Sequence, residues 1–80
     1  MNDYIAGLLQ SDDYKERMRG EYYFVKGKYE KLHRMIVKRE AGKLDFKPTL
    51  SIEQWKAQAS AMGSYLYQLE VAAYTEDIEL

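Results

Sequence analysis

The side chains best suited to bind a ligand lie on a basic, aromatic stretch between residues 14 and 41. Gly20 and Gly27 are seven residues apart, so a helix places them on one face. Aromatic and cationic side chains surround them: Tyr23, Lys31, Arg34 and Lys38 on that face, with Arg17, Phe24 and Lys28 beside it. Glycines allow close approach of a ligand, aromatic rings stack on bases, and Lys and Arg contact phosphates. The pattern predicts a small surface for a nucleotide or nucleic acid.

A second interpretation of the same pattern needs no ligand. Each glycine costs about 1 kcal/mol relative to alanine inside a helix, so a close neighbour is expected there. That neighbour can be another helix that crosses at Gly20 and Gly27, with solvated lysines around the crossing. Both interpretations hold together if the ligand site forms between two protomers.

Groups suited to catalysis are scarce. His33 is the only histidine and there is no cysteine, which leaves no ligand set for a transition metal. The serines have no base at a fixed spacing, and no Gly-rich phosphate loop occurs. We therefore expect a binding protein with no enzymatic activity, no metal and no cofactor.

Apolar residues spaced three and four apart predict the helices that carry these residues. One such series is Tyr14, Met18, Tyr22, Val25, Tyr29, Leu32 and Ile36, and a second is Ile52, Trp55, Ala59, Met62, Leu66, Leu69 and Ala73. Gly42 and Pro48 interrupt the pattern, while Ser51 and Gln54 form a capping box. We expect one all-α domain over residues 1–80, with helices at about 3–9, 13–41 and 52–74. The two long helices should form an antiparallel hairpin.

A hairpin of this size buries a thin core, and without a disulfide or metal the remaining means of stabilisation is self-association. A flank of the second long helix offers a surface for it, made of Ala61, Tyr65 and Ala72 with Gln54, Gln58 and Gln68. We expect a homo-oligomeric helical bundle. The short helix should place Ile5, Leu8 and Leu9 near Leu69 and Ala73.

Charge is unevenly distributed although the net charge is only −1. Residues 14–47 hold eleven Lys and Arg against five Asp and Glu, whereas the flanking segments are acidic. The asymmetry fits an anionic partner, or pairing between oppositely charged helices. Nucleic acid is the weakest candidate partner because acidic segments flank the basic helix on both sides. No apolar run approaches the roughly 20 residues that span a bilayer and no signal-peptide pattern begins the chain, so we expect a cytoplasmic protein without membrane contact.

Two sets of residues resemble a known family. On the first long helix they are Glu16-Arg17-Met18, Glu21-Tyr22 and Tyr29-Glu30-Lys31-Leu32; on the second they are Gln58, Ala61-Met62, Tyr65-Leu66 and Leu69-Glu70. The chain resembles, over about residues 14–74, the small helical-hairpin proteins of crAss-like and other gut phages. These in turn resemble the hairpin domain of anti-CBASS and anti-Thoeris sponge proteins.

The resemblance implies a phage anti-defence sponge that binds a cyclic nucleotide or cyclic ADP-ribose-type messenger without cleaving it, in the cytoplasm of the infected bacterium. Arg17, Lys28, Lys31 and Arg34 would contact phosphates. Tyr23, Phe24 or Tyr65 would stack on a base, and Gln58 would contact base or ribose edges. Two alternatives stay open: a small inhibitor or decoy that binds a host defence protein, and a purely structural assembly hairpin.

Overall fold

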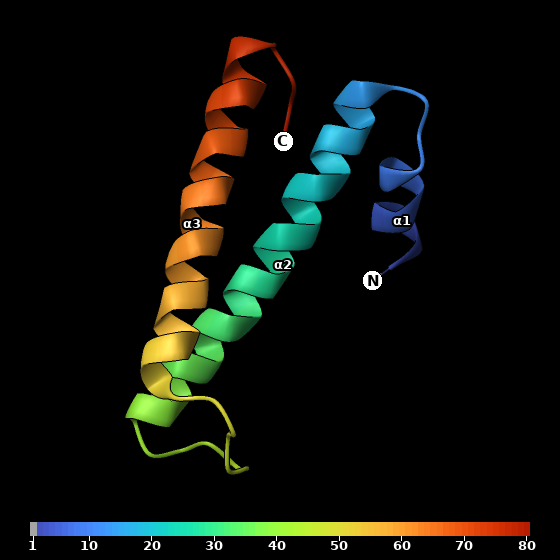
Figure 1. Ribbon diagram of the computed structural model, residues 1–80. Coiled ribbons are helices and arrows are strands. Elements are labelled where there is room, and N and C mark those ends of the chain that lie inside the picture. Colours follow the sequence, from blue (N-terminus) through green and yellow to red (C-terminus); the bar gives the residue numbers. More distant parts are fainter. Residues whose placement is uncertain (1) are drawn as a thin grey trace.

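Three helices make up the protein, as seen in a computed structural model that describes residues 2–80. They are α1 (Asp3–Leu9), α2 (Tyr14–Glu40) and α3 (Ile52–Thr75), joined by short connections (Figure 1). No strand occurs within residues 2–80, so this part of the chain is all-α as predicted. The observed helix ends lie within one residue of those expected from the sequence.

Polar side chains begin each helix. The side-chain oxygens of the N-cap residues Asn2, Asp13 and Ser51 accept hydrogen bonds from the backbone N–H groups of Ile5, Lys15 and Gln54 at 2.8, 3.0 and 3.1 Å. Each bond satisfies a backbone donor that has no partner inside its helix. Local sequence therefore fixes where the helices start.

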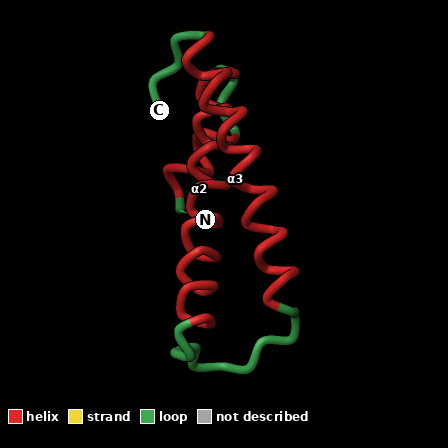
Figure 2. The backbone as a smooth tube through the Cα atoms, turned by 90° about the vertical axis from the view of Figure 1, so that its left-hand side faces the viewer, coloured by secondary structure: helices red, strands yellow, loops and turns green. Residues whose placement is uncertain are grey.

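Helix α2 ends at a glycine with a left-handed backbone. Gly42 has φ of 71°, and the N–H of Lys43 donates to the carbonyl of Lys38 at 2.8 Å. Together with the bond from Gly42 N–H to the Arg39 carbonyl at 3.1 Å, this is a Schellman motif. The chain then crosses residues 41–51 and returns as α3, antiparallel to α2 (Figure 2).

The core lies between α2 and α3 and is thin. Seven apolar residues of the described chain are buried: Leu8, Tyr22, Ile36, Trp55, Leu66, Ala73 and Ile78. Trp55 closes the loop end of the hairpin. The centroid of its ring lies 6.4 Å from the centroid of the Phe46 ring and 4.8 Å from the guanidinium of Arg39. Tyr14, which the apolar series placed in the seam, is half exposed, because its hydroxyl donates to the Glu76 carboxylate at the open end.

Helix α1 packs on α2, on the side away from α3 (Figure 1). Within residues 2–80 it makes no contact with α3, so the prediction that Ile5, Leu8 and Leu9 approach Leu69 and Ala73 is wrong. Its docking point is Gly20, where an added Cβ would lie 2.9 Å from the Cβ of Leu8. The missing side chain at Gly20 is what lets α1 approach α2 so closely.

The position expected for α1 is taken by residues 76–80. After α3 the chain turns back toward α2 (Figure 1), and Ile78 is buried. Asp77 makes the turn with φ of 55°, and the N–H of Ile78 donates to the carbonyl of Ala73 at 2.8 Å. This second Schellman motif carries the usual apolar contact between its last residue and the helix. We call residues 76–80 the tail.

None of the three helices is both long enough and apolar enough to cross a bilayer, as judged over residues 2–80.

Candidate functional site

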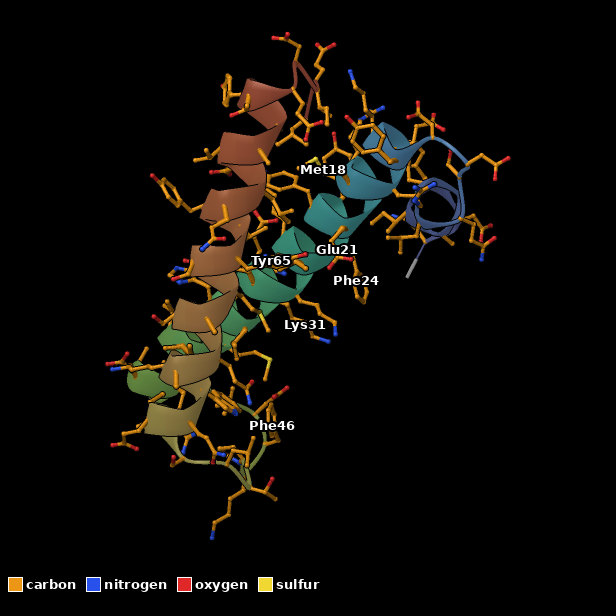
Figure 3. All side chains as sticks on the ribbon, turned by 45° about the horizontal axis from the view of Figure 1, so that its top comes forward. Met18, Glu21, Phe24, Lys31, Phe46 and Tyr65 are labelled. Atoms are coloured by element: carbon orange, nitrogen blue, oxygen red, sulfur yellow. The ribbon has the colours of Figure 1, made fainter. Side chains whose placement is uncertain are left out.

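The exposed side of α2 carries a pocket of about 260 Å³ beside α1. Its lining consists of Asn2, Ile5, Tyr23, Phe24, Gly27, Lys28 and Lys31. Figure 3 shows Phe24 and Lys31 projecting from α2 on the same side. Tyr23, Phe24, Gly27, Lys28 and Lys31 lie three and four apart on α2, so the helix itself brings them together. We call this the lysine pocket.

The floor of the lysine pocket is open at Gly27. A Cβ built there meets no atom of residues 2–80 within 4 Å, whereas the space in front of Gly20 is filled by α1. The two interpretations of the glycine pair therefore divide between the two positions. Gly20 is a helix crossing, and Gly27 leaves space in front of α2.

Cationic and aromatic groups are arranged around that space. The Lys28 ammonium lies 4.7 Å from the centroid of the Phe24 ring, within the range of a cation–π contact. Tyr23 packs with its ring centroid 6.4 Å from that of Tyr4 and 5.7 Å from that of Tyr22. Among residues 2–80, no carboxylate lines this pocket. Its chemistry suits an anionic group next to a flat ring.

Half of the predicted site residues are brought together here: Tyr23, Phe24, Lys28 and Lys31. Arg17 lies elsewhere, because its guanidinium donates to the carbonyl of Ser11 at 2.7 Å. Arg34 is exposed but lies outside the lining. Gln58 and Tyr65 are exposed on α3 and do not line the lysine pocket of their own chain.

A second pocket of about 430 Å³ adjoins the first and was not predicted. It lies between the first turns of α2 and the tail, and its lining is Asp13, Lys15, Glu16, Arg19, Tyr23, Asp77, Ile78, Glu79 and Leu80. We call it the tail pocket. Its only signal in the sequence is the spacing of four that links Lys15, Arg19 and Tyr23. That residues 77–80 line this pocket could not be predicted, because the sequence has no glycine at Asp77 to indicate the turn there.

A third pocket, of about 460 Å³, opens between α3 and the tail and is lined in part by Tyr22 and Glu70. The Tyr22 hydroxyl donates to the Glu70 carboxylate at 2.7 Å. That hydrogen bond, aided by burial, raises the pKa of Tyr22 to about 12. The pair joins α2 to α3 and supplies the partner that a seam tyrosine needs.

Groups of three or more His, Cys, Asp or Glu side chains that could hold a metal ion are absent from residues 2–80.

Comparison with known proteins addresses the family. The family model described as Sequestin matches residues 12–71, which is three quarters of the chain. The chain belongs to the Sequestin family. No curated protein and no solved structure matches it. The Sequestin match agrees with the resemblance to a small sponge-like helical family. It covers α2, the loop and most of α3, whereas α1 and the tail lie outside it.

Proposed function

We propose that this protein captures a phosphate-bearing cyclic nucleotide or cyclic ADP-ribose-type messenger and holds it without changing it chemically. The observation that carries the proposal is the lysine pocket, where two ammonium groups and two aromatic rings surround an open glycine. The family name Sequestin suggests sequestration of a ligand and supports the same function.

In this proposal each side chain of the lysine pocket has a role. Lys28 and Lys31 contact phosphate oxygens, and Tyr23 or Phe24 stacks on the base. Lys28 is already held over the Phe24 ring, so less of its freedom is lost when a phosphate binds. Gly27 leaves room for the ligand against the helix backbone.

A second copy of the chain completes the site in this proposal. A volume of about 260 Å³ is below the roughly 300–1,000 Å³ of pockets that enclose a small molecule. One chain therefore covers part of a nucleotide, and exposed groups on a second chain cover the rest. Gln58 and Tyr65 of that second copy are suited to contact the base and ribose.

The shape of the single chain supports self-association. Its radius of gyration is 15.0 Å, whereas a compact chain of 80 residues has about 12 Å. Its accessible surface is 5877 Å², whereas a folded monomer of this mass exposes about 5,000 Å². The excess resembles the roughly 800 Å² that each partner buries in a standard interface.

Isothermal titration calorimetry against cyclic dinucleotides, cyclic trinucleotides and cyclic ADP-ribose isomers tests the proposal. We expect one class to bind and to be recovered intact after the protein is denatured. Lys31→Glu should abolish binding, because it places a negative charge beside a phosphate. Lys47→Glu makes the same charge change in the exposed loop and should leave binding unchanged.

Each outcome separates the proposal from its rivals. If no messenger binds the wild-type protein, the sequestration proposal fails. If a messenger binds both charge variants equally, the ligand site lies outside the lysine pocket. Recovery of a hydrolysed messenger would show an enzyme instead of a sponge.

A further inference from the structure

The lysine pocket and the tail pocket adjoin at Tyr23, which lines both. The residues Lys15, Arg19, Tyr23, Gly27 and Lys31 follow one another at steps of four along α2. Each step rises about 6 Å and turns about 40° around the helix, so each residue lies next to the following one along a row that winds around α2. Arg19 and Gly27, one in each pocket, are thus about 12 Å apart along the helix axis. A ligand larger than one nucleotide reaches both pockets.

The two pockets differ in chemistry. Lysines without any carboxylate line one, whereas four carboxylates and two cations line the other. The two cations make hydrogen bonds to neutral groups, since the Lys15 ammonium donates to the Glu76 carbonyl at 3.3 Å and the Arg19 guanidinium donates to the Tyr4 hydroxyl at 3.2 Å. The side-chain carboxylates of the tail pocket outnumber its cations by two. Phosphates therefore favour the lysine pocket and are repelled from the tail pocket.

Two carboxylates of the tail pocket are free to accept hydrogen bonds. Asp13 caps α2, and Glu16 accepts from the Ser11 hydroxyl. Within residues 2–80 no side-chain hydrogen bond or ion pair engages Asp77 or Glu79. These carboxylates can bind a ligand group that is rich in hydrogen-bond donors, such as hydroxyls or amino groups.

A donor on the protein side also lacks a partner. Arg19 Nε is buried and makes no hydrogen bond within the described chain. Because that atom is closed to solvent, a ligand in the pocket meets the other N–H groups of the guanidinium, which lines the pocket. A ribose hydroxyl both donates and accepts, so it can donate to Asp77 and accept from those groups.

We infer that the tail pocket is a second subsite, which takes the ribose and base end of the messenger while its phosphates lie in the lysine pocket. Tyr23 stands between the two ends. Ile78, buried against the hairpin, holds the tail in place as the outer wall. The inference rests on the proposed function and adds the orientation of the ligand.

The test is whether removing the charge of one residue, Asp77, strengthens or weakens ligand binding. Asp77→Asn keeps the left-handed turn, because asparagine adopts that backbone well, and it removes a negative charge from the end of α3, so the melting temperature by circular dichroism should be equal to or slightly above that of the wild type. If Asp77 only repels an anionic ligand from a distance, losing its charge tightens binding. If Asp77 accepts hydrogen bonds from the ligand, the same substitution weakens binding.

Calorimetry with cyclic ADP-ribose and cyclic di-AMP measures this effect, with inorganic pyrophosphate as a phosphate-only competitor. We expect Asp77→Asn to lower the affinity for the messenger about tenfold and to leave the affinity for pyrophosphate unchanged. Asp12→Asn, an equal charge change on an exposed residue outside the three pockets described above, should weaken neither. Unchanged or tighter messenger binding by Asp77→Asn overturns the inference and leaves the proposed function standing. Failure of every messenger to bind wild type overturns both.

Discussion

The hydrogen bond between Tyr22 and Glu70 joins α2 to α3 through a buried tyrosine. Hydrogen bonds to charged groups contribute about 1.5–3 kcal/mol, and this one is part-buried. Tyr22→Phe should therefore lower the free energy of unfolding by about 1–2 kcal/mol in a urea titration. Tyr67→Phe removes a hydroxyl from a ring that is 66% exposed and should change it by less than about 0.5 kcal/mol.

The same bond predicts how stability depends on alkaline pH. The folded state raises the pKa of Tyr22 from 10.0 to about 12, so folding favours the neutral phenol. The stabilisation is fully present below pH 10 and is lost as pH rises through 10 toward 12. Urea midpoints measured across this range should fall for the wild type and fall less steeply for Tyr22→Phe. Parallel curves for the two proteins would contradict the assignment.

Asp77 is strained in a way that can be relieved. A left-handed backbone costs a residue with a Cβ up to about 1–2 kcal/mol, and a negative charge at the end of α3 opposes the helix dipole. Asp77→Gly removes both costs and should raise thermal stability by about 1 kcal/mol. If the tail pocket takes ribose, the same variant binds messenger more weakly.

At the scale of elements, the two glycines of α2 should respond oppositely to alanine. At Gly20 a Cβ would lie 2.9 Å from Leu8 Cβ and 3.0 Å from the Leu9 backbone nitrogen, so α1 must move away. At Gly27 nothing stands within 4 Å, and alanine should stabilise the helix by about 1 kcal/mol. Hydrogen exchange should show lost protection over residues 3–9 for Gly20→Ala only. Gly7→Ala, in α1 itself with open space around it, is the matched control.

The helices could largely be predicted from the sequence, because the residues that begin and end them act locally. Ser51, Asp13 and Gly42 mark helix ends through bonds made within a few residues. The placement of α1 was not predictable, because a glycine alone does not say which helix approaches it. The candidate site divides in the same way: Tyr23, Phe24, Lys28 and Lys31 share one helix and line one pocket, whereas the positions of Gln58 and Tyr65 relative to that pocket depend on how separate helices meet.

For the whole molecule we expect self-association through the flank of α3 that carries Tyr65. Light scattering at micromolar concentration should give a mass that is a multiple of 9.4 kDa. Tyr65→Glu should shift it toward the monomer and weaken messenger binding. Tyr67→Glu changes an exposed tyrosine on the opposite side of α3 and should do neither. A folded wild-type monomer would contradict the shared site, and dissociation by Tyr67→Glu alone would move the interface to that side.

The order in which the helices touch has a consequence for how the chain folds. Helix α1 contacts α2 and α2 contacts α3, so every packed pair is also adjacent in the sequence. Closing such short connections costs little chain entropy, and proteins dominated by local contacts fold in microseconds to milliseconds. A newly made chain would thus become competent within a small fraction of the time needed for its synthesis, and the slower step would be its encounter with a second copy.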